Sequence, residues 1–172
     1  KEESYINSVY YADWAIGQFI QKAKKQPWYK NTIFVLVADH GHHSHTITSP
    51  NQSLFFRIPL LIFGEPLKHE FRGKQCTKIG SQSDIAATLL HQMRYSSNQF
   101  KFSKDLLSPD VQSFAFHSTI RGYGFITEKG SFIYNLDAKR NLENKFSKVD
   151  FPSQKNKSDA LFLSYYLYFK SL

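Results

Sequence analysis

The sequence predicts an α/β fold with a mostly parallel sheet, followed by a smaller antiparallel sheet. The first observation is an amphipathic helix over residues 4–25, where apolar side chains recur at three- and four-residue steps. The second is the β-branched apolar run at residues 32–38, which is typical of a strand buried on both faces of a parallel sheet. The third is a series of short apolar runs with glycine turns after residue 113, which is typical of antiparallel strands.

The central part of the chain adds two elements to the predicted core. A second apolar run covers residues 58–63, and Pro59 confines its hydrogen-bonded part to an edge or to the positions after the proline. Ser81 and Asp84 have the spacing of a capping box, which predicts a helix over residues 84–93 with Asp84 as a cap rather than a catalyst. A short strand is also predicted at residues 76–79.

The C-terminal part is predicted to form a meander and a last helix. Its three strands are expected at residues 114–120, 123–127 and 131–136. Residues 138–158 are polar and predict little regular structure. Ser158 is expected to cap a helix over residues 159–170, whose apolar side chains lie almost all round and therefore require burial on several sides.

Composition limits the class of protein. The chain has 172 residues, of which 41% are hydrophobic and 16% aromatic, so it can bury a core and is not disordered. The single cysteine, Cys76, excludes an internal disulfide and a cysteine-built metal cluster. No apolar stretch reaches the roughly 20 residues that a membrane helix needs. Because the chain starts at Lys1 with helical character and without an initiator methionine, we expect a part of a longer protein.

The charge of +8 is a property of the whole surface rather than of one patch. An excess of cations favours anionic partners. The lysines are scattered in pairs, however, and the sequence contains no nucleic-acid-binding module. We therefore expect a solvated basic surface and no nucleic-acid partner.

The residues with the clearest chemistry follow the first predicted strand. The run at 32–38 ends on Asp39, His40 and Gly41, and ligands of α/β sheets bind beyond the carboxyl ends of strands. Asp39 and His40 would point to opposite faces of a regular strand, so both reach one ion only if the strand ends there and Gly41 lets the chain turn. A carboxylate and an imidazole are ligands for divalent cations. The pair supplies two ligands, which is half of a metal site.

Alternatives stay open for these residues and for the other histidines. Asp39 could accept turn amides at a strand end while His40 is merely exposed. His42, His43 and His45 are either further ligands, donors to an anionic substrate or exposed loop residues. The remaining histidines and an aspartate on the apolar stripe of the first helix are expected to have structural roles: His69, His91, His117 and Asp13.

Four blocks of sequence together resemble a known family. They are the segment from Tyr5 to Ile20 of the first helix, the segment from Trp28 to Asp39-His40-Gly41, the segment Arg57-Ile-Pro-Leu-Leu-Ile-Phe-Gly, and Ser83-Asp-Ile-Ala-Ala-Thr-Leu-Leu. In order and spacing they resemble the C-terminal half of a sulfatase-family catalytic domain in the alkaline phosphatase superfamily. Within that family they are most similar to the lipoteichoic acid synthase-like, phosphoglycerol transferase branch.

The resemblance implies a partial alkaline phosphatase-like αβα sandwich. Residues 1–94 would be the C-terminal part of the catalytic core, and residues 95–172 a small subdomain with an antiparallel sheet and a final helix. The aspartate and histidine that match Asp39 and His40 bind a divalent cation in this family, with manganese or magnesium favoured here and calcium or zinc as alternatives. His42 and His45 are expected to contact substrate.

The resemblance also implies what lies outside this chain. The nucleophile, and one further acidic ligand, belong to the N-terminal half of such proteins, so no catalytic nucleophile is expected after Lys1. The substrate would be a phosphate or sulfate ester, and the parent protein would be anchored at the outer face of a bacterial membrane. The alternative is a non-catalytic module that binds anions through its basic surface.

Overall fold

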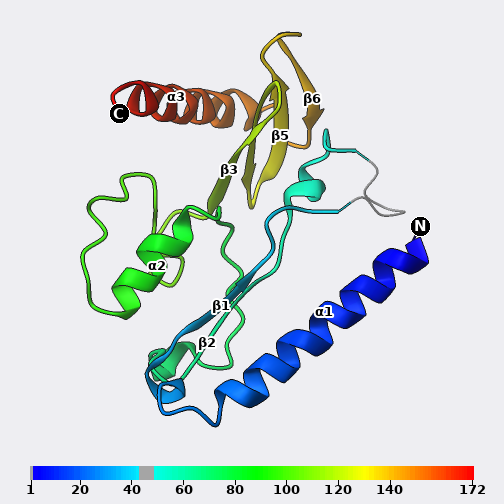
Figure 1. Cartoon of the computed structure of the whole chain (residues 1–172). Coiled ribbons are helices and arrows are strands. Elements are labelled where there is room, and N and C mark those ends of the chain that lie inside the picture. The colour runs from blue at the N-terminus through cyan, green and yellow to red at the C-terminus, as the bar shows by residue number, and fades with distance from the viewer. Residues whose placement is uncertain (1, 43–48) are drawn as a thin grey trace. The chain divides into compact units, whose positions relative to one another are not determined.

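The structure is a computed structural model, and it describes residues 2–42 and 49–172 (Figure 1). The chain forms two compact units. The first contains residues 1–37 and 60–72, and the second contains residues 38–59 and 73–172. These units are defined by packing, while the division into residues 1–94 and 95–172 stays a prediction.

The first unit combines a long helix with a two-stranded sheet. Its helix α1 spans Glu2–Ala23, and its strands are β1 (Phe34–Val37) and β2 (Leu60–Phe63). The short 3-10 helices η1 (Tyr29–Asn31) and η3 (His69–Phe71) complete it. Phe34 is the centre of packing here: its ring lies 5.1 Å from the ring of Phe63 and 6.3 Å from that of Phe19.

The pairing of the two strands differs from the prediction. The fold class is α/β, but β1 and β2 are antiparallel, with Phe34 opposite Phe63 and Val37 opposite Leu60. A parallel pair needs a crossover connection, usually a helix, and the only described helix between these strands is the single turn η2 (Ser53–Phe56). An apolar run does not indicate strand direction. The sequence between the two runs lacks helical periodicity, and this feature favours an antiparallel pair over a parallel one.

Burial of the first strand also differs from the prediction. Phe34 is the only buried residue of β1, and Val37 is 42% exposed. The apolar run suits a strand that is buried on both faces, but the described residues of this chain cover the strand pair only in part.

The second unit is built on a four-stranded antiparallel meander. Its strands are β3 (Phe114–Thr119), β4 (Gly122–Thr127), β5 (Gly130–Asn135) and β6 (Arg140–Asn144), in that spatial order. Helix α3 (Phe151–Lys170) lies beside the sheet, and α2 (Asp84–Gln92) precedes it in the chain (Figure 1). The core between α3 and the sheet is aromatic, with Tyr123, Phe125, Phe132 and Phe146 buried.

The three predicted strands and the helix at 84–93 are confirmed, while three other expectations are corrected. Strand β6 lies in a stretch predicted to be irregular, because its polar residues resemble a loop and only pairing with β5 makes them a strand. Helix α3 begins at Phe151, eight residues early, since Pro152 suits a first helical turn; Ser158 is a fully buried residue inside it. Residues 76–79 form no strand.

The last helix is not buried on every side. Leu163, Tyr166 and Leu167 of α3 are each more than half exposed, although its opposite face contacts the sheet. Among the described helices, none has the length and apolar character needed to span a membrane.

Candidate metal-binding turn

Asp39 and His40 lie in a turn directly after β1, as the sequence predicts. The strand ends at Val37, and the backbone N–H of His40 donates to Asp39 Oδ1 over 2.8 Å. This bond is the strand-end interaction expected of an aspartate without a metal. It uses only one carboxylate oxygen, so Asp39 Oδ2 remains available for another partner.

The second carboxylate oxygen faces the imidazole. His40 Nε2 lies 3.4 Å from Asp39 Oδ2, and both side chains are largely exposed, at 72% for His40 and 85% for Asp39. The two donor atoms therefore converge on one side of the turn rather than pointing to opposite faces. Two atoms that bind one ion at about 2.1 Å are about 3.0–3.4 Å apart, so this separation fits shared coordination.

A hydrogen bond fixes which imidazole nitrogen can act as a ligand. His40 Nδ1 lies 2.8 Å from the carbonyl oxygen of Gly41. A carbonyl can only accept, so Nδ1 carries the proton and donates. Histidine ligands commonly donate their second N–H to a carbonyl in this way, which leaves Nε2 as the binding atom. Nε2 and Asp39 Oδ2 then face each other at a spacing that suits a shared metal ion.

Gly41 is required at its position by a close backbone approach. A Cβ built on Gly41 would lie 1.8 Å from the carbonyl oxygen of Phe55 in η2. Any larger residue would push the turn away from η2, so Gly41 does more than permit the change of direction.

Gln82 also contacts the turn, and sequence reasoning missed it. Its Nε2 donates to the carbonyl oxygens of Ala38, over 2.8 Å, and Asp39, over 3.0 Å. Gln82 lies just before α2, where the sequence marked only Ser81 and Asp84 as capping residues. No sequence pattern around Gln82 signals a contact with a turn more than forty residues away.

The structure describes only some of the other predicted site residues. His42 is exposed next to the turn, while His43 and His45 lie outside the described residues. Among residues 2–42 and 49–172, no cluster of three or more His, Cys, Asp or Glu side chains is arranged to hold a metal. Asp39 and His40 fit a divalent cation in donor type and spacing, but two ligands do not close a site.

The histidines that were expected to be structural lie away from the turn or in packing roles. His91 Nδ1 lies 3.1 Å from Asp105 Oδ2, and its Nε2 lies 3.0 Å from Ser97 Oγ. His117 stacks on Phe56, with ring centroids 3.7 Å apart, and burial lowers its pKa to about 4. Asp84 is buried in an ion pair with Lys104 and accepts the backbone N–H of Ser81. The predicted capping box is not formed, because the N-cap of α2 is Ser83 without a side-chain capping bond and the Ser81 hydroxyl pairs with Phe116.

Comparison with known proteins identifies the family. The family model for sulfatases matches residues 2–95, more than half of the chain. The chain belongs to the sulfatase family. The matched region includes β1 and the turn with Asp39 and His40.

Two of the similar curated proteins are from Bacillus subtilis. The lipoteichoic acid synthase-like protein YvgJ is 28% identical over 137 residues, which is 72% of this chain and 22% of that protein. Lipoteichoic acid synthase 2 is 27% identical over 164 residues, or 86% of this chain and 24% of that protein. The predicted resemblance to this branch is confirmed. The chain spans about a quarter of the length of these relatives.

A solved structure shows the same fold. It is a protein of the alkaline phosphatase superfamily from Vibrio parahaemolyticus, with a TM-score of 0.69 and 23% identity. The match covers 92% of this chain and 40% of that one. The chain therefore has the fold of part of an alkaline phosphatase-like α/β protein, as the sequence predicts.

Proposed function

We propose that this chain is the C-terminal part of a divalent-metal-dependent enzyme that transfers or hydrolyses phosphate or sulfate esters, with Asp39 and His40 as two of the metal ligands. The observation that carries the proposal is the 3.4 Å separation of Asp39 Oδ2 and His40 Nε2, combined with the bond from His40 Nδ1 to Gly41. Membership of the sulfatase family supports it. Within the family we favour the phosphoglycerol transferase reaction, because two similar proteins carry lipoteichoic acid synthase names.

The residues of the turn have separable tasks in this proposal. Asp39 would bind the ion through Oδ2 while Oδ1 stays bonded to the backbone N–H of His40, which keeps the carboxylate in place. His40 would bind through Nε2, with its ring orientation set by Gly41. When bound, a divalent cation lowers the pKa of an attacking hydroxyl and neutralises charge on the transferred group. Manganese or magnesium is favoured for the site, and calcium or zinc are alternatives.

Other parts of the active site would come from outside this chain. The nucleophile is expected upstream of Lys1, together with a further acidic ligand, so the isolated chain should be inactive. His42 and His45 are candidates for contact with the substrate's oxygens. By the same family resemblance, we expect the complete protein to be anchored at the extracytoplasmic face of a bacterial membrane.

The test is an Asp39→Asn variant in a protein that carries the complete catalytic domain. The amide keeps the volume of the side chain but removes the negative charge that attracts the ion. We expect metal-dependent turnover to fall at least a hundredfold, while the circular dichroism spectrum and melting temperature stay unchanged. His91→Gln is the matched control, because His91 also faces an aspartate yet lies outside the turn. Full activity of the Asp39→Asn variant with metal bound would contradict the proposal.

A further inference from the structure

The turn formed by residues 38–41 is held in place by side chains from other elements of the second unit. One amide group of Gln82 donates to two successive carbonyl oxygens of the turn, those of Ala38 and Asp39. The Gln82 side chain is exposed, so it adds little to the core. Its contacts restrict the backbone that carries the two proposed ligands.

A second contact joins the turn to η2. The backbone at Gly41 approaches Phe55 so closely that no Cβ would fit. The position of η2 therefore sets the position of the His40–Gly41 peptide. Moving η2 would also move the carbonyl oxygen that orients the His40 ring.

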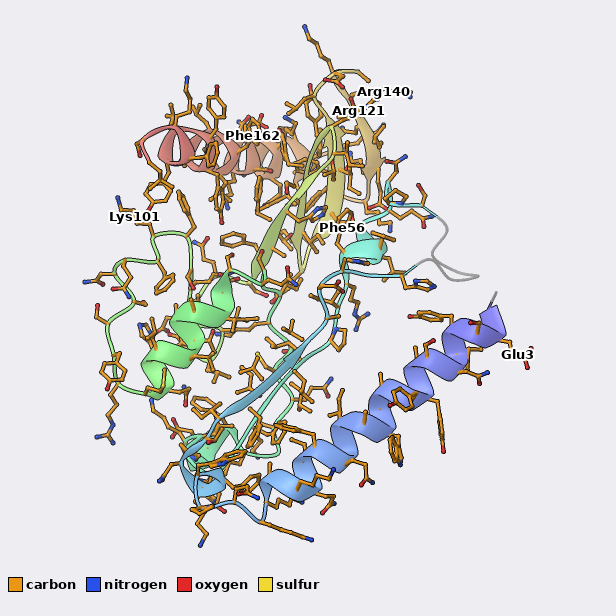
Figure 2. All side chains as sticks on the ribbon, in the orientation of Figure 1. Glu3, Phe56, Lys101, Arg121, Arg140 and Phe162 are labelled. Carbon is orange, nitrogen blue, oxygen red and sulfur yellow. The ribbon has the colours of Figure 1, made fainter. Side chains whose placement is uncertain are left out.

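The position of η2 is in turn set by the meander sheet at two points. At its start, the backbone N–H of Ser53 donates to Glu143 Oε2 over 2.9 Å, and the Ser53 hydroxyl donates to the same carboxylate. The other oxygen of Glu143 lies 2.8 Å from Lys145 Nζ. At its end, Phe56 stacks on His117 of β3, and Figure 2 shows Phe56 beside the sheet. Glu143 thus connects β6 to a segment 90 residues earlier in the sequence.

Gln82 is connected to the same sheet through its neighbour Ser81. The Ser81 hydroxyl accepts the backbone N–H of Phe116 and donates to the carbonyl oxygen of Phe116, both over 3.0 Å. Both anchors of the turn therefore lead to β3, one through Ser81 and Gln82 and the other through η2. An exposed turn with only one anchor could shift by more than the roughly 0.5 Å that a metal site tolerates.

We propose that Gln82 and Glu143 are positioning residues for the turn that carries Asp39 and His40. Gln82 acts on the turn directly, and Glu143 acts through η2. The small C-terminal sheet is then a support for the metal ligands rather than a separate binding module. The part of this inference that concerns the metal rests on the proposed function, whereas the restriction of the turn does not.

The experiment measures metal affinity and backbone exchange in the same variants. Gln82→Ala and Glu143→Ala are compared with Gln112→Ala, which removes an exposed glutamine side chain elsewhere in the second unit. All variants are made in a protein that carries the complete catalytic domain. Manganese binding is followed by electron paramagnetic resonance, and hydrogen–deuterium exchange is measured in peptides that cover residues 34–42. We expect Gln82→Ala and Glu143→Ala each to weaken binding about tenfold, and the double variant to weaken it further.

Hydrogen–deuterium exchange and the melting temperature together distinguish a loss of turn positioning from a general loss of structure. Residues 38–42 should exchange several-fold faster in both variants, while the melting temperature of Gln82→Ala stays that of the parent chain and Gln112→Ala changes nothing. Glu143 is partly buried, so Gln82→Ala decides the result if Glu143→Ala unfolds. Unchanged affinity and unchanged exchange in Gln82→Ala would overturn the inference.

Failure of the proposed function gives a different result. In that case the protein with the complete catalytic domain binds no manganese, or its Asp39→Asn variant binds manganese equally well. Exchange of residues 38–42 then decides the positioning roles alone: faster exchange in Gln82→Ala supports them, and equal exchange contradicts them.

Discussion

The two units of this chain bury their apolar side chains to very different extents. In the second unit Phe132 and Ile133 are fully buried, and Tyr123 is 2% exposed. In the first unit the apolar stripe of α1 remains open, with Ile6 59%, Val9 50% and Phe19 54% exposed. An amphipathic helix gains stability by covering its stripe, and this chain supplies only a partial cover. The second unit thus has a core of its own, while the first depends on a few contacts around Phe34.

The proposed metal-binding turn takes its support mainly from the second unit. The turn with Asp39 and His40 belongs to the second unit, which is the better packed one. The strand that leads into the turn belongs to the first. The turn therefore takes its support from Gln82 and η2, and not only from the strand that the sequence identifies.

The largest expected difference is in the free energy of unfolding when a phenylalanine of each unit is replaced by alanine. Phe132→Ala should destabilise the second unit by about 3–5 kcal/mol, because it empties a fully buried ring site. Phe19→Ala should cost the first unit less than about 1 kcal/mol, because Phe19 is half exposed and meets Phe34 by an edge contact. Urea unfolding followed by two probes measures both values.

The unfolding of each unit can be followed by its own signal, because both tryptophans lie in one unit. Trp14 and Trp28, the only tryptophans in the sequence, both lie in the first unit, so tryptophan fluorescence reports on it alone. Pulsed hydrogen–deuterium exchange of peptides from β4 and β5, read at each urea concentration, reports on the second. A Phe132→Ala variant that shifts both probes equally would show that the units unfold as one, and the comparison would fail.

Acid should weaken the second unit through His117. Burial lowers the pKa of His117 from 6.5 to about 4, so between these pH values the unfolded chain binds a proton that the folded chain does not. Stability must then decrease as the pH falls from 6.5 to 4, by about 3 kcal/mol in total. Hydrogen bonds from Lys145 and Ser53 lower the pKa of Glu143 despite its burial, which adds a loss in the same direction below its ordinary pKa of 4.5.

A variant isolates the contribution of the histidine. His117→Phe keeps a ring for the stack with Phe56 but cannot be protonated, so the loss of stability between pH 6.5 and 4 should largely disappear. Equal acid sensitivity in His117→Phe and the parent chain would assign the effect to other groups.

Elements that depend on a local sequence pattern were predicted correctly. Features that depend on packing between distant residues were not. The helices at 4–25 and 84–93 and the strands of the meander follow from periodicity and turn residues, and the position of Asp39 and His40 follows from the end of an apolar run. Strand direction, the polar strand β6 and the early start of α3 depend on partners far along the chain. Gln82 and Glu143 escaped detection for the same reason, since each acts on residues more than forty positions away.

If the turn is part of a metal site, the imidazole of His40 binds the metal directly. Electron spin echo spectroscopy detects a directly bound nitrogen in a manganese-loaded protein that carries the complete catalytic domain. Nitrogen coupling should be present in that protein and in its His91→Gln variant. We predict that His40→Gln abolishes this coupling. The same nitrogen coupling in His40→Gln, at equal manganese occupancy, would contradict the assignment of His40 as a ligand.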